Sequence, residues 1–206
     1  MIYTSEMADS EKAQKMLRVA EATLKILDQH GITGLSFSRV ARSAAVSRTW
    51  LYKYIGGSDQ ELLAFAVETF GRIYARLDDS GSHRNDKEWL RGTVARFGRL
   101  LDSTIQYPSV LPIYFKFRGS ENLVGKTIEG IERIYLSRQT AELERIFSLP
   151  AKTARLAAEV LLGIRIGVAH RWLQTGMRQK VKKEELLVFL TRSLIPLIKA
   201  GKRGSL

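Results

Sequence analysis

Cysteine is absent from the 206 residues of this chain. A disulfide framework and a thiolate metal site are therefore excluded, and a reducing compartment, the cytoplasm, is the expected location. The three histidines, His30, His83 and His170, lie far apart without metal-ligand spacing, so we expect no metal and no other cofactor. No apolar run approaches the ~20 residues that span a bilayer. The first residues also lack a secretory signal pattern, so we expect no membrane partner.

Enzyme signatures are missing as well. The sequence offers no thiol nucleophile, no Ser/His/acid arrangement, no phosphate-cradling Gly loop and no paired carboxylates in an evident cleft. We therefore expect that the protein is not an enzyme. The alternation typical of strands and any internal repeat are absent too, whereas apolar residues recur at helical spacing. The predicted fold class is all-α.

Acidic residues are outnumbered, which gives a net charge of +12. A basic balance favours a polyanionic partner, although it is weak evidence alone. Residues 1–59 hold eight cations and six acids, so most of the surplus lies beyond them. That remaining surplus needs a separate explanation.

The segment from Ser36 to Ile55 is predicted to form two short helices with a tight break between them. Ser36 and Ser47 can each cap a helix by accepting a bond from a backbone N–H one turn later. The inward residues would be Phe37, Val40, Ala41 and Ala44 on the first helix, and Val46, Leu51 and Ile55 on the second.

The outward side of the second helix is basic, aromatic and rich in hydroxyl groups. Between Gly31 and Ser58 there are four cations and no acid, which suits a helix that enters a DNA major groove between phosphates. An isolated short helix with such a face is more often simply solvated, but the companion helix and a long bracing helix favour DNA. The predicted DNA-binding residues are Ser36, Ser38, Arg39, Ser47, Arg48, Thr49, Trp50, Tyr52, Lys53 and Tyr54. For Trp50, groove contact and packing are equally open, and for Tyr52 a mixed core and phosphate role is favoured.

The order of a hydroxyl residue, Val40-Ala41, a small-residue turn, Val46-Ser47 and Leu51-Tyr-x-Tyr resembles the DNA-binding domain of the tetracycline-repressor (TetR) family. The resemblance implies a helix-turn-helix domain over residues 1–58 and a helical ligand-binding and dimerisation domain over residues 59–206. It also implies a homodimer on a palindromic double-stranded DNA operator and a small-molecule effector.

Three positions depart from the family pattern. Ala45 stands where the family usually has Gly, so either a left-handed backbone there costs about 1–2 kcal/mol or the turn is built differently. Asp59 replaces a usual Lys at the start of the fourth helix, and Trp50 replaces a small residue. We therefore expect operator contacts that differ from those of relatives.

Apolar periodicity predicts the remaining helices, and Gly and Pro limit them. Pro108 should end one helix near Tyr107, and Pro112 should interrupt the segment that follows. Residues 78–85 are expected to form a polar loop. The expected helices cover about residues 10–30, 59–77, from Leu90 to Tyr107, 123–147, 151–175 and 183–200.

The last two expected helices are the most apolar part of the chain. The run from Leu161 to Ala169 is hydrophobic nearly all round, so more than one of its faces should be buried. Gly163 and Gly167 lie one turn apart, where a second helix could approach closely. The residues predicted to form the dimer interface are Gly163, Gly167, Leu187, Leu190 and Leu194.

Aromatic residues around the interrupted middle segment suggest a ligand cavity, although each of them taken singly is more often plain core. Arg165, flanked by two isoleucines, needs an anionic partner. An acid such as Glu159 or Glu129, within the chain or across the dimer, would supply it, which we slightly favour, and an acidic ligand is the alternative. The predicted ligand-binding residues are Phe97, Leu101, Tyr114, Phe115, Phe117, Ile131, Tyr135, Arg165 and Trp172.

The sequence therefore predicts a sequence-specific DNA-binding transcriptional regulator, a homodimeric repressor released by a small molecule. An amphipathic anion is the favoured effector class, because cations cluster in the middle helix and between Val160 and Lys183. Simple solvation of those cations is equally open. The alternative function is an all-helical small-molecule or lipid-binding protein whose helix pair is vestigial.

Overall fold

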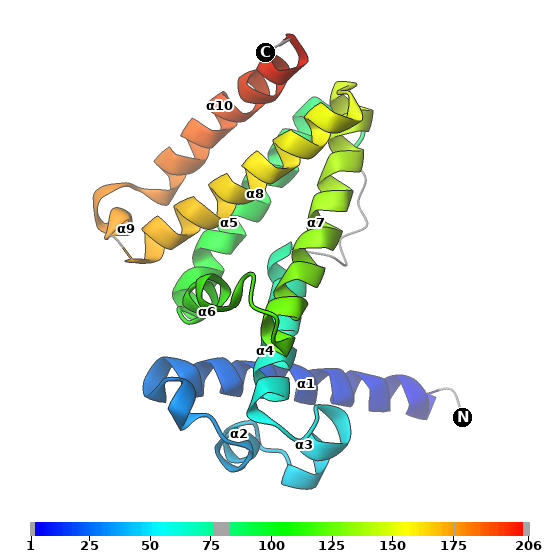
Figure 1. Cartoon of the computed structure of the whole chain (residues 1–206), viewed down its shortest axis with the longest axis vertical. Coiled ribbons are helices and arrows are strands. Elements are labelled where there is room, and N and C mark those ends of the chain that lie inside the picture. The colour runs from blue at the N-terminus through cyan, green and yellow to red at the C-terminus, as the bar shows by residue number, and fades with distance from the viewer. Residues whose placement is uncertain (1–2, 76–82, 175, 204–206) are drawn as a thin grey trace. The chain divides into compact units, whose positions relative to one another are not determined.

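The computed structural model describes residues 3–75, 83–174 and 176–203 (Figure 1). Over these ranges the chain forms helices and their connections and no strand, so the all-α prediction is confirmed. The chain divides into two compact units. The first unit contains Met1–Arg76 and Tyr107–Ile131, and the second contains Leu77–Gln106 and Glu132–Leu206.

The first unit begins with a long helix, α1 (Tyr3–His30), which starts earlier than the predicted residue 10. Gly31 follows it with a φ of 66°, a conformation that favours glycine and ends the helix. The other elements are η1 (Ile32–Gly34), α2 (Phe37–Ser43), α3 (Arg48–Tyr54), α4 (Asp59–Ala75), α6 (Val110–Phe117) and the start of α7 (Leu123–Phe147).

Pro112 does not interrupt α6, contrary to the prediction. It lies in the first turn of the helix, where a missing backbone N–H is tolerated because that N–H would have no intrahelical acceptor. The prediction for Pro108 is confirmed, since α5 ends at Gln106.

The core of the first unit forms where α1 packs against α2 and α4. Val19, Val40 and Leu51 are each 0% exposed there. The buried side of α4, with Leu62 and Phe70, belongs to the same core. The compact unit therefore extends beyond the predicted boundary at residue 58, because α4 packs on α1.

The second unit contains α5 (Asp86–Gln106), the rest of α7, α8 (Ala151–Gln174), α9 (Met177–Lys180) and α10 (Lys183–Arg203). Helices α5, α8 and α10 pack against one another. Trp89 is 0% exposed, and its ring meets that of Phe147 edge-on at 5.2 Å between centroids.

Two features of the second unit differ from the sequence predictions or escape them. The short helix α9 was not predicted, and Gly176 begins it in a left-handed conformation. The predicted polar loop over residues 78–85 lies mostly outside the described residues. Among the helices that are described, none is long and apolar enough to cross a membrane.

Candidate nucleic-acid interface

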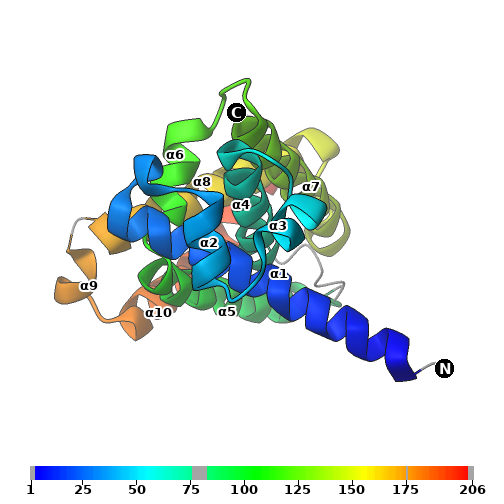
Figure 2. The same cartoon turned by 90° about the horizontal axis from the view of Figure 1, so that it is seen from below.

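Helices α2 and α3 form a pair joined by a short turn, and both are labelled in the view from below in Figure 2. Ser36 and Ser47 cap them as predicted. The Ser36 hydroxyl accepts from the backbone N–H of Arg39, and the Ser47 hydroxyl accepts from that of Trp50 at 3.0 Å. Each cap satisfies a backbone donor that the first turn leaves without a helical acceptor.

Leu51 is the buried residue of α3, at 0% exposed, and it fixes the helix on the core of the first unit. Trp50 is half-buried and packs against that core. The rest of the outward side is exposed to solvent. We call this side the recognition face, and it consists of Arg48, Thr49, Trp50, Tyr52, Lys53 and Tyr54.

The turn before α3 has a left-handed residue at Ala45, with a φ of 54°. The sequence left two possibilities open for Ala45, a strained left-handed backbone or a different turn. The structure has the left-handed backbone. A long-range bond supports this turn: Arg18 of α1 donates through Nε to the carbonyl oxygen of Ala44 at 3.2 Å. The entry to α3 is thus set from α1 as well as from the chain itself.

The connection after α3 is stabilised by a capping box. The Glu61 carboxylate accepts from the backbone N–H groups of Gly57 and Ser58 at 2.8 and 2.9 Å, and from the Ser58 hydroxyl at 2.9 Å. The backbone N–H of Glu61 donates in return to the Ser58 hydroxyl. The Ser58 hydroxyl and then these backbone donors hold the pKa of the Glu61 carboxyl below its ordinary value.

A chain of contacts connects the first residue of α3 to the core. The guanidinium of Arg48 donates to the Tyr52 hydroxyl at 3.2 Å. The Tyr52 ring stacks on Phe37 with 4.8 Å between centroids and 7° between planes, and Phe37 is buried. Tyr52 is still 46% exposed, so one of its faces packs while its hydroxyl stays available.

Three further side chains gather around Tyr54 at the end of α3. Its ring lies 4.9 Å from that of Trp50. The Nζ atoms of Lys53 and of Lys12, from α1, lie 5.1 and 4.9 Å from the Tyr54 centroid. Lys12 is not among the residues predicted from the sequence, because no local pattern signals a contact between residues so far apart in the chain.

The structure brings the predicted DNA-binding residues together on the first unit. Arg39 is exposed on α2, and its guanidinium donates to the carbonyl oxygen of Gly34 at 3.0 Å. Cations, hydroxyls and aromatic edges on a short, exposed helix can donate hydrogen bonds to base edges and neutralise phosphates.

The predicted ligand-binding residues fall into both units. Phe97, Leu101, Tyr135, Arg165 and Trp172 are buried in the second unit, whereas Tyr114, Phe115, Phe117 and Ile131 belong to the first. Phe115 is 50% exposed, so it does not line an enclosed cavity within its own unit. The common cavity predicted from the sequence stays a prediction.

Arg165 is buried, at 8% exposed, on the inner side of α8. Its guanidinium lies 4.9 Å from the centroid of the Tyr135 ring, a cation–π contact that the sequence did not suggest. Glu159, one proposed partner, instead accepts from Arg155 at 2.7 Å. Tyr135 therefore supplies part of the stabilisation that was expected from an acid.

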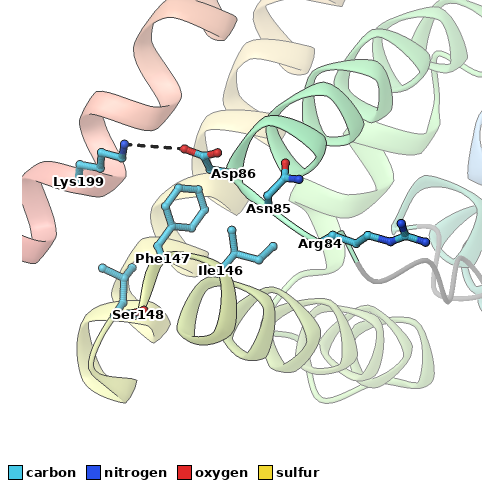
Figure 3. A pocket seen from close by; sticks show the side chains of 8 residues that line it. Arg84, Asn85, Asp86, Ile146, Phe147, Ser148 and Lys199 are labelled. Atoms are coloured by element: carbon cyan, nitrogen blue, oxygen red, sulfur yellow. Dashed lines mark ion pairs between the residues drawn. The ribbon is translucent and has the colours of Figure 1, made fainter.

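A pocket of about 470 Å³ opens in the second unit at the start of α5 (Figure 3). Its lining includes Ile146 and Phe147 and two cations, Arg84 and Lys199. Lys199 lies 3.8 Å from the carboxylate of Asp86 across the pocket (Figure 3). None of the predicted ligand-binding residues lines it.

The dimer prediction needs a correction in α10. Leu190 and Leu194 are 6% and 5% exposed within the single chain, and Leu187 packs over Gly98 of α5. Leu190 and Leu194 therefore face the core of the second unit and not an outer surface, whereas Leu187 is half-buried. Gly163 and Gly167 do face open space. The exposed large apolar residues of α8 and α10 are Leu156, Val160, Val188, Phe189 and Leu197.

Metal ligation finds no support in the described part of the chain, where no three His, Asp or Glu residues are grouped as ligands. His83 Nδ1 instead lies 2.8 Å from the Glu142 carboxylate.

No protein-family model and no curated protein matches the sequence, but solved structures match the fold. A protein assigned as a transcriptional regulator in Pseudomonas aeruginosa PAO1 superposes with a TM-score of 0.69 and 21% identity over 93% of this chain and 94% of its own. A TetR-family transcriptional regulator from Streptomyces coelicolor gives 0.66 and 14% over 92% and 82%. The regulator FadR from Bacillus subtilis, solved with stearoyl-CoA, gives 0.64 and 20% over 90% and 98%. The chain therefore has the all-α fold of these regulators, with an N-terminal helix-turn-helix.

Proposed function

We propose that this chain is a TetR-type transcriptional regulator that binds DNA in a sequence-specific manner and works in the cytoplasm as a homodimeric repressor. One observation carries the proposal: the recognition face of α3 is exposed and basic, while Leu51 and both serine caps hold the helix in place. The segment between Gly31 and Ser58 contains no acid, which suits a surface that contacts phosphates and favours a functional DNA-binding unit over a vestigial one. The fold shared with solved regulators supports the same function.

Selection of genomic fragments on the purified protein tests this function. Two copies of α3 would bind two half-sites, so the expected result is an enriched palindrome with half-sites about one helical turn apart. Recovery of no enriched sequence at any salt concentration would overturn the proposal and would favour the alternative of a small-molecule or lipid-binding protein.

Within that function, Arg48 and Lys53 have different roles. An arginine at the start of a recognition helix can bind guanine in a bidentate manner, worth about 1–3 kcal/mol of discrimination, whereas lysine on a phosphate adds affinity for every sequence. Arg48→Ala should therefore flatten the selected motif, and Lys53→Ala should leave the motif intact. Equal losses on operator and random DNA for both variants would contradict this assignment.

The dimer is proposed to form on the outer side of α8 and α10. Gly163 and Gly167 leave room on α8 for a partner helix, and Phe189 is 66% exposed on α10. Phe189→Asp should weaken the dimer by about 2 kcal/mol or more, the loss typical of an interface hot spot. Sedimentation at several concentrations measures this, and Glu184→Ala, exposed on the same helix, is the control.

The effector is proposed to be an amphipathic anion with a long apolar part. Cations cluster in the middle helix and between Val160 and Lys183, and the FadR of Bacillus subtilis was solved with stearoyl-CoA. Such a ligand weakens DNA binding only as far as it prefers a state that does not bind DNA. Thermal-shift screening of acidic against neutral apolar compounds decides the class, and release of DNA by neutral compounds alone would refute it.

A further inference from the structure

One tyrosine of α3 is contacted by lysines from two different helices. The Nζ atoms of Lys12 on α1 and Lys53 on α3 lie 4.9 and 5.1 Å from the centroid of the Tyr54 ring. Both lysines are exposed, and the tyrosine is 37% exposed. The ring therefore gathers two solvent-accessible ammonium groups at the end of the recognition face.

These two like charges are close enough to repel each other. Their distances to one centroid put the Nζ atoms within about 10 Å of each other, which is the screening length at ordinary ionic strength. Attraction to the electron-rich ring offsets part of the repulsion. The nearest carboxylate in the sequence, Glu11, pairs instead with Lys15 at 2.6 Å. An external anion would stabilise both lysines at once.

The start of α4 cannot supply cations on this side of α3. Its first turn carries Asp59 and Glu61, and the Glu61 carboxylate is used in the capping box. The cations that contact Tyr54 at the end of α3 are Lys53 of the same helix and Lys12 of α1. Lys12 lies on the long helix that also supports the turn before α3 through Arg18.

We propose that Lys12 and Lys53, arranged around Tyr54, form a binding site for a phosphodiester of the DNA backbone. This inference rests on the proposed DNA-binding function and extends the interface to α1. Tyr54 acts as a positioning residue, because its ring holds both ammonium groups. A phosphate held from two helices fixes how α3 sits along the groove, and it adds affinity without sequence preference.

Lys12→Ala in the full chain tests the site, with an enriched operator fragment and a random fragment as probes. Each phosphate contact contributes about 0.9 to the slope of log affinity against log salt. We expect the affinity for both fragments to fall by the same factor, about 3- to 10-fold at moderate salt, and the slope to decrease by about 0.9 for each half-site. Lys12→Arg should restore the wild-type slope.

Lys25→Ala is the matched control. Lys25 is exposed on the same helix, about 20 Å from Lys12 along the helix axis and on a different face. The salt slope of the Lys25→Ala variant should therefore equal that of the wild type. Tyr54→Leu adds a second test, since without the ring the further change Lys12→Ala should alter the slope less. Identical slopes for Lys12→Ala and Lys25→Ala, with operator binding intact, would overturn this inference and leave the proposed function standing. Failure of the wild-type protein to enrich any operator would instead overturn both.

Discussion

Helices α3 and α8 each place one arginine against a tyrosine ring, but in opposite environments. In α3 one residue, Leu51, is buried and Arg48 is exposed. In α8 six residues are buried, and Arg165 is one of them. Both arginines contact a tyrosine ring, Tyr52 and Tyr135 respectively, but the first contact lies in solvent and the second lies in the core.

The difference shows where each helix obtains its position. A helix of two turns cannot bury enough surface to hold itself, so α3 depends on Leu51 and on the segments before and after it. α8 is long enough to bury a continuous stripe, and a cation within that stripe becomes part of the core.

Leu51→Ala should have the largest effect. Truncation of a fully buried leucine removes apolar contacts and leaves a cavity, which lowers the free energy of unfolding by about 2–5 kcal/mol. Urea denaturation followed by circular dichroism measures the loss. Thr49→Ala, on the exposed side of the same helix, should stay within about 0.5 kcal/mol. If Leu51→Ala lowered the free energy of unfolding by less than about 0.5 kcal/mol, the segments before and after α3, and not Leu51, would hold the helix in place.

The buried contact in α8 should come next. A double-mutant cycle with Arg165→Met and Tyr135→Leu should give a coupling energy of about 2 kcal/mol, since a desolvated cation–π contact is stronger than an exposed one. The control is the exposed pair of Arg155 and Glu159 on the same helix, for which we expect about 0.3–0.5 kcal/mol. Equal coupling in both cycles would remove the contrast between core and surface.

Ala45→Gly should stabilise the protein by about 1 kcal/mol, because glycine adopts the left-handed conformation before α3 without the clash of a Cβ atom. The midpoint of thermal unfolding measures the gain. Ala44→Gly is the control: Ala44 has a φ of −85° and is 1% exposed, so glycine there should destabilise the protein. A gain at both positions would mean that backbone strain is not the cause.

The smallest effect concerns the capping box after α3. The lowered pKa of Glu61 means that its ionised form stabilises the folded state. This contribution is complete above the unfolded pKa of about 4.3 and is lost as pH falls through the lower folded pKa. Glu61→Gln should therefore flatten the decline of stability between about pH 5 and 3. An acid unfolding curve parallel to that of the wild type would contradict the assignment.

Local features of this fold were predictable from the sequence, whereas contacts between distant segments were not. The caps Ser36 and Ser47, the stop at Gly31 and the buried side of α2 follow from neighbouring residues, and the structure has each of them. The lysine contacts at Tyr54 depend on how α1 crosses α3.

The error at Leu190 and Leu194 has the same origin. A leucine stripe shows that one side of α10 is buried, but periodicity does not tell a neighbouring helix of the same chain from a helix of a second copy. α5 and α8 already cover that stripe. The exposed apolar residues of α10 are Val188, Phe189 and Leu197.

The contacts from Arg48 through Tyr52 to Phe37 have a thermodynamic consequence for any DNA complex. A free arginine side chain has about 2 kcal/mol of rotamer entropy to lose when it is immobilised. Here the Tyr52 hydroxyl and ring already restrict the guanidinium, and the stacked Phe37 restricts Tyr52. Part of the ordering is complete before association, so the entropic penalty at this position is smaller. A larger share of the hydrogen-bond enthalpy gained at a base edge would then contribute to the binding free energy.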